Sequence, residues 1–334
     1  MVFWPSDIQN RLNGEFGSWK VQEPENLSEY TRKTWAGKKL PGCPGIAMGL
    51  FLSLPNSAQN PSKRPKILGI AEVRIWATNL PASLDFYSKT LNLAHDVSAM
   101  FPDENFLLNP FQGIWVRPGP TPMHANLIDQ ITFITDDIPA LRRYLVSYQV
   151  SVSDPAGYYF TVVDPEGHRI GFMERREWPP DTQSSSPATH STFRLIHAGI
   201  IVHDRAAEDH FYKDILGFQV YWHGGMKDDE TNWVDMQVPD GTDWLEYMLN
   251  VPANADKRTL GVMNHIALGV PDIHPAEKQL RANGWNEIEE PKIGRDGKWQ
   301  LNLYDPDDTL VELMEFMPVQ KPCCSEYTGP HPKP

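Results

Sequence analysis

Four polar residues lie in segments that otherwise have the composition of buried strands. They are two histidines and two glutamates, each with apolar residues at alternate positions around it: His197, Glu246, His265 and Glu312. Because side chains two residues apart in a strand share a face, each of the four points to the same side as apolar neighbours. A carboxylate buried there without a partner is costly, so a compensating charge is expected.

A divalent metal ion would supply that charge. Imidazole nitrogens and carboxylate oxygens together suit Zn, Ni, Co, Mn or Fe(II). A lone histidine in a strand is more often a hydrogen-bonded core residue than a ligand. Four such residues at matching places in a repeat favour a metal site, and we predict that all four bind one ion.

The same residue types also predict a kind of reaction. A metal ion can stabilise the oxyanion that forms when a proton is removed next to a carbonyl group. A carboxylate that can loosen from the metal can act as the general base. Glu312 and Glu246 are both candidates for this catalytic role, and the sequence does not distinguish them.

The elements that must position these residues belong to an internal repeat. Two helical segments each begin with a capping residue, carry Phe-Tyr in the middle and end at a residue that favours a left-handed turn. Two hairpins each have an Asp-Pro turn between apolar strands. The helical segments are 79–93 and 203–218, and the hairpins are 162–174 and 303–315.

Each copy of the repeat divides again into two units of strand, helix and about three short strands. The sequence therefore predicts an α+β protein of four βαβββ modules that form two tandem domains. The predicted parts are an N-terminal extension (1–66), a first domain (67–176), a Pro/Ser linker (177–192), a second domain (193–317) and a Pro-rich tail (318–334).

The first domain serves as an internal comparison. Alignment of the copies places Glu72 opposite the first histidine and Gln130 opposite the second. Gly171 and, approximately, Trp115 stand opposite the two glutamates. The histidines and both aligned glutamates are therefore missing, and we predict a scaffold domain without metal ligands.

The chain resembles the vicinal oxygen chelate superfamily, the group of glyoxalases, bleomycin-resistance proteins and extradiol dioxygenases. The resemblance rests on FYKDILGF at 211–218 and on DPDD…VEL at 305–313, and it covers about 67–317. It implies that the paired βαβββ modules of each domain curl into a half-open mixed-sheet barrel, around one divalent metal. That metal offers two adjacent coordination sites to a substrate with neighbouring oxygens.

Two enzymatic branches of the superfamily fit. Glyoxalase I and acyl-CoA epimerase use a full His-Glu-His-Glu set, which implies a lyase or isomerase. Two-domain extradiol dioxygenases use Fe(II) and a triad that here would be His197, His265 and Glu312. Their characteristic tyrosine is Asn302 in this chain, however, and 290–304 contains no histidine. A non-catalytic binding protein of the bleomycin-resistance kind is a third alternative, although such proteins lack the metal ligands.

The second domain is rich in aromatic residues and methionine, and it shows no basic cluster for glutathione or coenzyme A. We predict a small oxygenated substrate that is fairly apolar or aromatic. Trp233 and Trp244 are candidates for the pocket wall, and His223 and Asn302 for contacts near the metal. The segment 224–231 is a loop that could cover the site.

Acidic residues outnumber basic ones 43 to 30, for a net charge of −13. We expect no nucleic-acid or membrane partner, and a homodimer is compatible with the sequence. The three cysteines form no CxxC pair, so neither a disulfide framework nor a cysteine zinc site is expected. We predict a cytoplasmic protein, although the segment 37–60 has the order of a secretory signal.

Overall fold

The computed structural model describes residues 63–96, 103–153, 157–175 and 193–334. All of them belong to one compact unit, residues 58–334. The signal-like segment 37–60 and the linker 177–192 lie outside the described residues. Within the described ranges, no helix is both long and apolar enough to cross a membrane.

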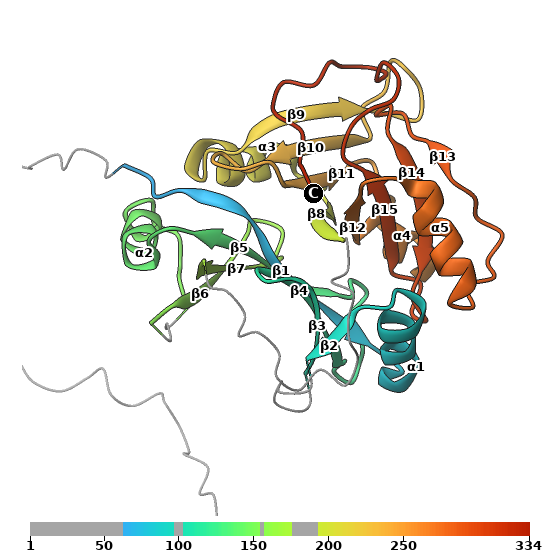
Figure 1. The fold of residues 1–334 in the computed structure, drawn as a ribbon. Helices are drawn as coiled ribbons and strands as arrows, with labels where there is room; N and C mark the ends of the chain where they lie inside the picture. The colour runs from blue at the N-terminus through green and yellow to red at the C-terminus, as the bar shows by residue number, and fades with distance from the viewer. Residues whose placement is uncertain (1–62, 97–102, 154–156, 176–192) are drawn as a thin grey trace, which may run out of the picture. The chain divides into compact units, whose positions relative to one another are not determined.

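Two mixed sheets, one from each copy of the repeat, form the body of this unit (Figure 1). The first contains β1 (Ile67–Ala77), β2 (Ala94–Asp96), β3 (Glu104–Asn109), β4 (Gln112–Pro118), β5 (Ile128–Thr135), β6 (Tyr159–Val163) and β7 (Arg169–Glu174). The second contains β8 (Arg194–Ile201), β9 (Gln219–Gly224), β10 (Trp233–Gln237), β11 (Trp244–Met248), β12 (His265–Val270), β13 (Lys292–Ile293), β14 (Trp299–Tyr304) and β15 (Leu310–Glu315).

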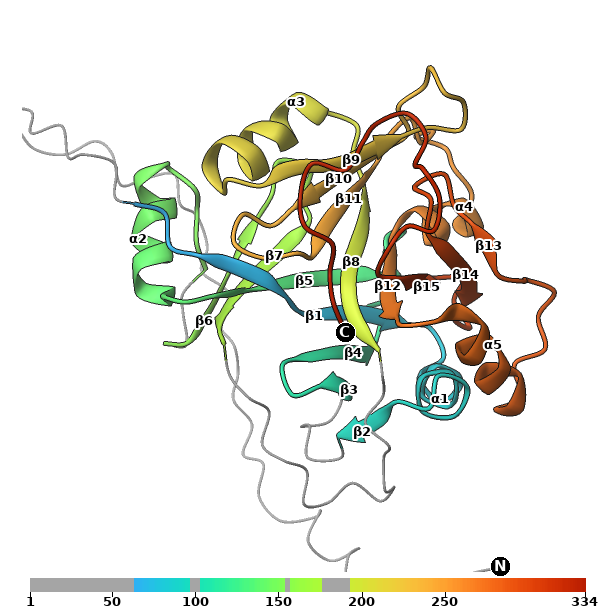
Figure 2. The ribbon, with the colours of Figure 1, turned by 45° about the horizontal axis from the view of Figure 1, so that its top comes forward.

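The order of strands shows how modules pair. The first sheet runs β2-β3-β4-β1-β5-β7-β6 and the second β13-β14-β15-β12-β8-β11-β10-β9. In each sheet the first strands of two modules are antiparallel neighbours at the centre, β1 with β5 and β8 with β12. Figure 2 shows β8 and β12 between the two wings of the second sheet. The predicted fold class, two tandem domains of paired modules, is confirmed.

Two details differ from the expectation. The second module of the first copy has two described strands after its helix, β6 and β7, rather than about three. An additional helix, α4 (Lys257–Met263), joins the two modules of the second copy. Asp256 accepts a hydrogen bond from the backbone N–H of Thr259 at its start. This short helix has no counterpart in the described part of the first copy.

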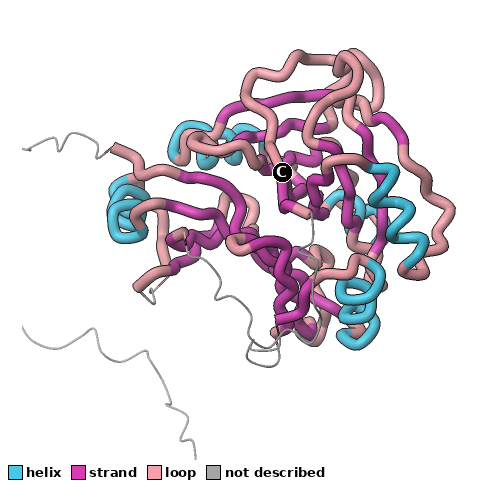
Figure 3. Tube along the Cα trace, viewed as in Figure 1, coloured by secondary structure: helices cyan, strands magenta, loops and turns pink. Residues whose placement is uncertain are grey.

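The helices begin and end where the sequence predicts, and they lie around the strands (Figure 3). Asn79 and Asp204 cap the first helix of each copy by accepting hydrogen bonds from backbone N–H groups. Asn92 and Gly217 follow these helices with φ angles of 53° and 81°. The helices are α1 (Leu80–Asp85) with η1 (Phe86–Thr90), α2 (Ile138–Ser147), α3 (Arg205–Glu208) with η2 (Asp209–Ile215), and α5 (Ile273–Ala282).

Matched contacts hold the two copies together. The Tyr87 hydroxyl of η1 donates a hydrogen bond to Asp305 in the second copy's hairpin, at 3.3 Å. The Tyr212 hydroxyl of η2 donates one to Asp164 in the first copy's hairpin, at 3.0 Å. Each copy thus docks its helix against the Asp-Pro turn of the other.

Gln112 adds a buried connection between the sheets. Its amide nitrogen donates hydrogen bonds to the carbonyl oxygens of Ile70 and Leu195, both at 2.8 Å, and its amide oxygen accepts one from the Leu195 N–H. One hydrophobic core runs through both copies. The first copy is therefore an integral part of the unit that positions the site.

Candidate metal centre

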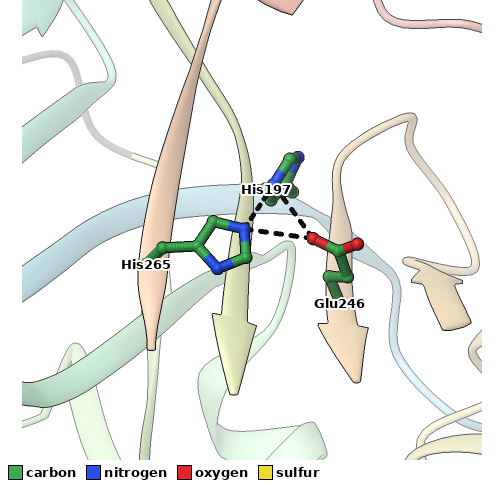
Figure 4. Close-up of side chains that lie close together, drawn as sticks. All are labelled: His197, Glu246 and His265. Carbon is green, nitrogen blue, oxygen red and sulfur yellow. Dashed lines mark hydrogen bonds and ion pairs between the residues drawn. The ribbon is translucent and has the colours of Figure 1, made fainter. Parts of the chain in front are cut away.

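The four predicted side chains converge on one face of the second sheet. His197 Nε2 lies 3.0 Å from His265 Nε2 and 3.4 Å from Glu246 Oε2. His265 Nε2 lies 3.0 Å from the same Glu246 oxygen. Figure 4 shows these three side chains pointing toward one another from β8, β11 and β12. Glu312 reaches the group from β15, with Oε2 3.5 Å from His197 Nε2.

These spacings fit donors that share one ion. Nitrogen and oxygen ligands lie about 2.0–2.2 Å from zinc, so neighbouring donors around one ion are about 3.0–3.5 Å apart. The donor types, two imidazoles and two carboxylates, also suit a divalent ion. The residues present therefore fit a metal site.

Small residues make the convergence possible. Gly199 lies between Glu246 and His265 in the cross-strand register, and a Cβ on Gly199 would overlap the imidazole of His265. In the adjacent row of the sheet, Ala267 of β12 lies between the other two donors, His197 and Glu312. Neither small residue could be selected from the sequence, since their role depends on the register of strands far apart in the chain.

The two imidazoles are held in fixed orientations. The His265 Nδ1 lies 3.3 Å from the carbonyl oxygen of Met263, which can only accept a hydrogen bond. Nδ1 therefore carries a proton, and Nε2 is directed at the centre. The His197 ring packs against the Trp244 ring with 4.7 Å between centroids.

Burial dominates the electrostatics of the site. It lowers the pKa of His197 well below its usual value, and the charge of His265 acts in the same direction. Burial also acts to lower the pKa of His265, but the hydrogen bond and charge of Glu246 outweigh it and raise that pKa. Burial raises the pKa of Glu312 to about 8, although the charge of His265 opposes the shift. Without a metal, burial therefore disfavours the charged forms of His197 and Glu312.

The first copy fills the equivalent place with a cation of its own. Arg74 stands in the row between Trp115 and Gln130, where the second copy has Gly199. Its guanidinium forms an ion pair with the buried Glu72 at 2.9 Å. An arginine therefore compensates this buried carboxylate, and the long side chain occupies space that the second copy leaves open.

A cavity of about 410 Å³ adjoins the four donors. Trp233, Trp244 and Asn302 line it. His223 is not among its lining residues: it pairs with Val234 in the sheet, while its neighbour Trp222 takes the cavity-facing position. β9 is an edge strand whose pairing with β10 contains a bulge, and a bulge changes the face on which the next residues lie. Strand alternation in the sequence therefore did not predict the face of His223.

One buried charged group close to the cavity-lining Trp244 was not recognised from the sequence. Lys298 is fully buried, and burial lowers its pKa. Its Nζ faces three aromatic rings, Trp244 at 4.6 Å, Tyr327 at 5.2 Å and Tyr221 at 5.5 Å, and has no hydrogen-bond partner among the described residues. From the sequence alone, a lysine next to a glycine in a loop is predicted to lie at the surface.

The Pro-rich tail packs on β9 at the edge of the second sheet. The Thr328 N–H donates to the Tyr221 carbonyl oxygen at 3.0 Å, and the Trp222 indole N–H donates to the Cys323 carbonyl oxygen at 3.1 Å. Cys323 and Cys324 form a disulfide between adjacent residues. A single bond between neighbouring residues is not a disulfide framework, and the spacing rules applied to the sequence do not consider it.

Glu315, in the same strand as Glu312, acts outside the site. It accepts a hydrogen bond from the Ile273 N–H at 3.0 Å, at the first residue of α5. A carboxylate at a helix start is stabilised by the free N–H groups there.

Part of the chain is similar in sequence to known proteins. Residues 194–313 match the model of the Glyoxalase/Bleomycin resistance protein/Dioxygenase superfamily. A lactoylglutathione lyase from Haemophilus influenzae is 27% identical over 124 residues, which are 36% of this chain and 92% of that protein.

Solved structures of dioxygenases share the fold. A variant of homoprotocatechuate 2,3-dioxygenase from Brevibacterium fuscum has a TM-score of 0.57 at 18% identity, over 75% of this chain and 72% of that one. The enzyme of the same name from Arthrobacter globiformis has a TM-score of 0.54 at 18% identity, over 76% and 82%. Residues 194–313 are thus similar to the glyoxalase, bleomycin-resistance protein and dioxygenase superfamily, and the fold is shared with solved dioxygenases.

Proposed function

We propose that this protein is a metal-dependent lyase or isomerase that acts on a small oxygenated metabolite. The observation that supports this reaction class is the position of Glu246. Its Oε2 lies 3.0 Å from His265 Nε2 and 3.4 Å from His197 Nε2, inside the donor group. A triad of His197, His265 and Glu312 would not require a fourth donor, a second carboxylate, at this place.

The four donors would hold one divalent ion, of Zn, Ni, Co, Mn or Fe(II). Such an ion, when bound, polarises a carbonyl oxygen and stabilises the oxyanion that follows proton removal. Glu312 is our choice as the base that accepts this proton, and Glu246 is then a lasting ligand. Among the ion pairs of the described residues, Glu312 pairs with His197 at 3.5 Å and Glu246 pairs with both histidines, so we choose the less firmly held Glu312 as the carboxylate that moves toward a substrate.

The cavity supports a small, fairly apolar or aromatic substrate. Its walls near the donors are large apolar side chains, among them Trp222, Trp233, Trp244, Met248 and Met314. Among the described residues, the only cations that line it are Lys292 and Arg295. That is enough for one anionic group, and it does not make a binding site for the several charges of a large thiol cofactor.

An Fe(II) ring-cleaving dioxygenase is the second candidate. The fold of the homoprotocatechuate 2,3-dioxygenases favours it, and the three donors that it needs are present. Asn302, which stands where that branch has its tyrosine, lies opposite Glu312 in the sheet and cannot supply a phenol. A non-catalytic binding protein is the third candidate, and would require that no metal binds.

The test combines metal content with one substitution. Protein purified without oxygen or added metal should contain about one equivalent of Ni, Co, Mn or Zn at this centre. Glu246→Gln keeps the shape of the side chain but removes its charge. We expect it to slow solvent deuterium exchange next to a substrate carbonyl by roughly 10²–10³-fold, because an ion that is held less well would stabilise the oxyanion less. Glu290→Gln makes the same chemical change at an exposed position and should have no effect.

Other outcomes would redirect the assignment. One equivalent of iron, a mild effect of Glu246→Gln and oxygen uptake with aromatic diols would establish the dioxygenase. Absence of metal, with none taken up on titration and with ligand affinity unaffected by chelators, would establish the binding protein.

A further inference from the structure

A second group of metal-ligating side chains lies at the contact between the two copies. Asp164 and His168 come from the hairpin of the first copy, and Glu208 comes from the end of α3 in the second. One ligand atom of each residue lies within 4.8 Å of the others. His168 Nδ1 is 2.8 Å from Asp164 Oδ2. Both carboxylates are buried, with 4% of Asp164 and 0% of Glu208 exposed.

Glu208 has a buried carboxylate oxygen without a hydrogen-bond partner among the described residues. Its Oε1 accepts a hydrogen bond from the Glu166 N–H at 3.0 Å, whereas Oε2 has no partner in the described part of the chain. An ionised Glu208 would place a second buried negative charge beside Asp164. A protonated Glu208 would carry a hydroxyl donor with no acceptor. Both states leave a buried polar group uncompensated.

No basic side chain solves this problem. The ion pairs of the described residues include none for Glu208, and His168 is the partner of Asp164. Burial, followed by the negative charge of Asp164, raises the pKa of Glu208 to about 8. A cation that binds all three side chains would compensate both carboxylates.

The repeat shows that the fold itself does not need these residue types. In both hairpins an aspartate accepts hydrogen bonds from two backbone N–H groups of its own turn. Asp164 does so at 3.1 and 2.8 Å, and Asp305 does so twice at 2.9 Å. Each of these aspartates also accepts the hydroxyl hydrogen bond of the other copy's tyrosine. The turn and its docking are therefore the same at the two contacts.

The two contacts differ at the positions that could bind a metal. Four residues after the turn aspartate, the first copy has His168 and the second has Thr309. Three residues before the Phe-Tyr pair, the second copy has Glu208 and the first has Ser83. One contact forms with two hydroxyl side chains, while the other has an imidazole and a carboxylate within reach of each other. The imidazole and the second carboxylate therefore occur together at one contact and are both replaced by hydroxyl side chains at the other.

We propose that Asp164, His168 and Glu208 bind a divalent cation, of the zinc or manganese class, at the contact between the copies. One nitrogen and two carboxylate oxygens suit such an ion, with water at its other positions. The 14% of the His168 side chain that is exposed provides access from solvent. The ion would link the first copy to the second, and this role does not depend on the reaction at the other centre.

The test uses the full chain with the first centre disabled. His197→Ala/His265→Ala removes both imidazoles of that centre, and circular dichroism checks that the protein is folded. We expect this variant to bind about one equivalent of Zn²⁺ in equilibrium dialysis and to melt at a higher temperature when Zn²⁺ is present. Co²⁺ should give the visible absorption of a nitrogen and oxygen site.

Further substitutions in that background introduce the residues of the other contact. Glu208→Ser and His168→Thr should each weaken Zn²⁺ binding by more than about tenfold and remove the thermal shift. Ser83→Ala, at the contact without the ligand set, should leave both unchanged. The proposal is overturned if the disabled variant binds no Zn²⁺, or if both substitutions leave binding intact. Failure of the first centre is recognised separately, because the wild type would then bind no more metal than the disabled variant.

Discussion

Gly199→Ala is the substitution for which the structure gives the most defined expectation. Gly199 lies on β8 between Glu246 and His265, and its backbone is not in the left-handed region that only glycine adopts easily. Alanine can therefore keep the backbone conformation. Its methyl group would overlap the Cε1 and Nδ1 atoms of the His265 ring. The ring must move, and the strand does not need to.

The size of the effect follows from contact distances. Carbon atoms pack at about 3.5–4.0 Å, so the ring must shift by roughly 1.5 Å to make room. A metal site keeps its ligand distances within about 0.2 Å. The displaced imidazole cannot remain a ligand, and we expect metal affinity to fall by roughly 10²-fold or more, about 2.7 kcal/mol. Overpacking should cost a further 1–3 kcal/mol or so of folding stability.

Titration calorimetry with the metal found in the native protein provides the assay. Gly269→Ala is the matched control, because its methyl group would press on Phe316 in the same domain and touch no ligand. It should reduce stability while leaving metal affinity near that of the wild type. His265→Ala is the benchmark for full loss of the imidazole.

A double variant shows whether the effect passes through the ring. When His265 is already alanine, the methyl group at Gly199→Ala has free space, so the second substitution should cost no additional affinity. Wild-type affinity in Gly199→Ala would refute this reasoning. Additive losses in the double variant, or an equal loss in Gly269→Ala, would do the same.

Three further expectations concern pH and the contacts between copies. Because burial raises the pKa of Glu312 to about 8, metal must displace a proton at neutral pH. Affinity should therefore rise about tenfold per pH unit from pH 6 to 7 and level off above pH 8, and a flat profile would count against Glu312 as a ligand. Tyr87→Phe removes one buried hydrogen bond and should lower the free energy of unfolding in urea by about 1 kcal/mol, with metal content unchanged. Gln112→Ala leaves backbone groups of Ile70 and Leu195 unpaired and should cost about 3 kcal/mol, and a loss below about 1 kcal/mol would show that water replaces the side chain.

The sequence was sufficient for the fold and for the choice of the four converging residues. Alternation in strands assigned each side chain to a face, and the repeat gave His197, Glu246, His265 and Glu312 equivalent places in their modules. The helix caps at Asn79 and Asp204 are local signals that the structure bears out. These inferences needed only neighbours in sequence or the comparison of one copy with the other.

What the sequence could not supply depends on the register between distant strands. Gly199 becomes important only because β11 and β12 place donors on both sides of it. Arg74 is unremarkable until it is seen in the same row of the first copy. The sequence around Lys298 does not indicate burial, because part of its cover is Tyr327 of the C-terminal tail, which is distant in the sequence. Packing between remote segments decides all three.

The crossed docking of helices on hairpins links the thermodynamics of the two halves. Neither copy can open without exposing the core that it shares with the other, so the described part of the chain should unfold in one cooperative step. An ion present at a thousandfold excess over its Kd would then add about 4 kcal/mol to the stability of both halves. Binding and folding are linked in both directions. A core substitution in the first copy that destabilises the fold should therefore also weaken binding of the ion between His197 and Glu312, although the substituted side chain lies in the other copy. The copy without the four donors thus contributes to the holding of the metal.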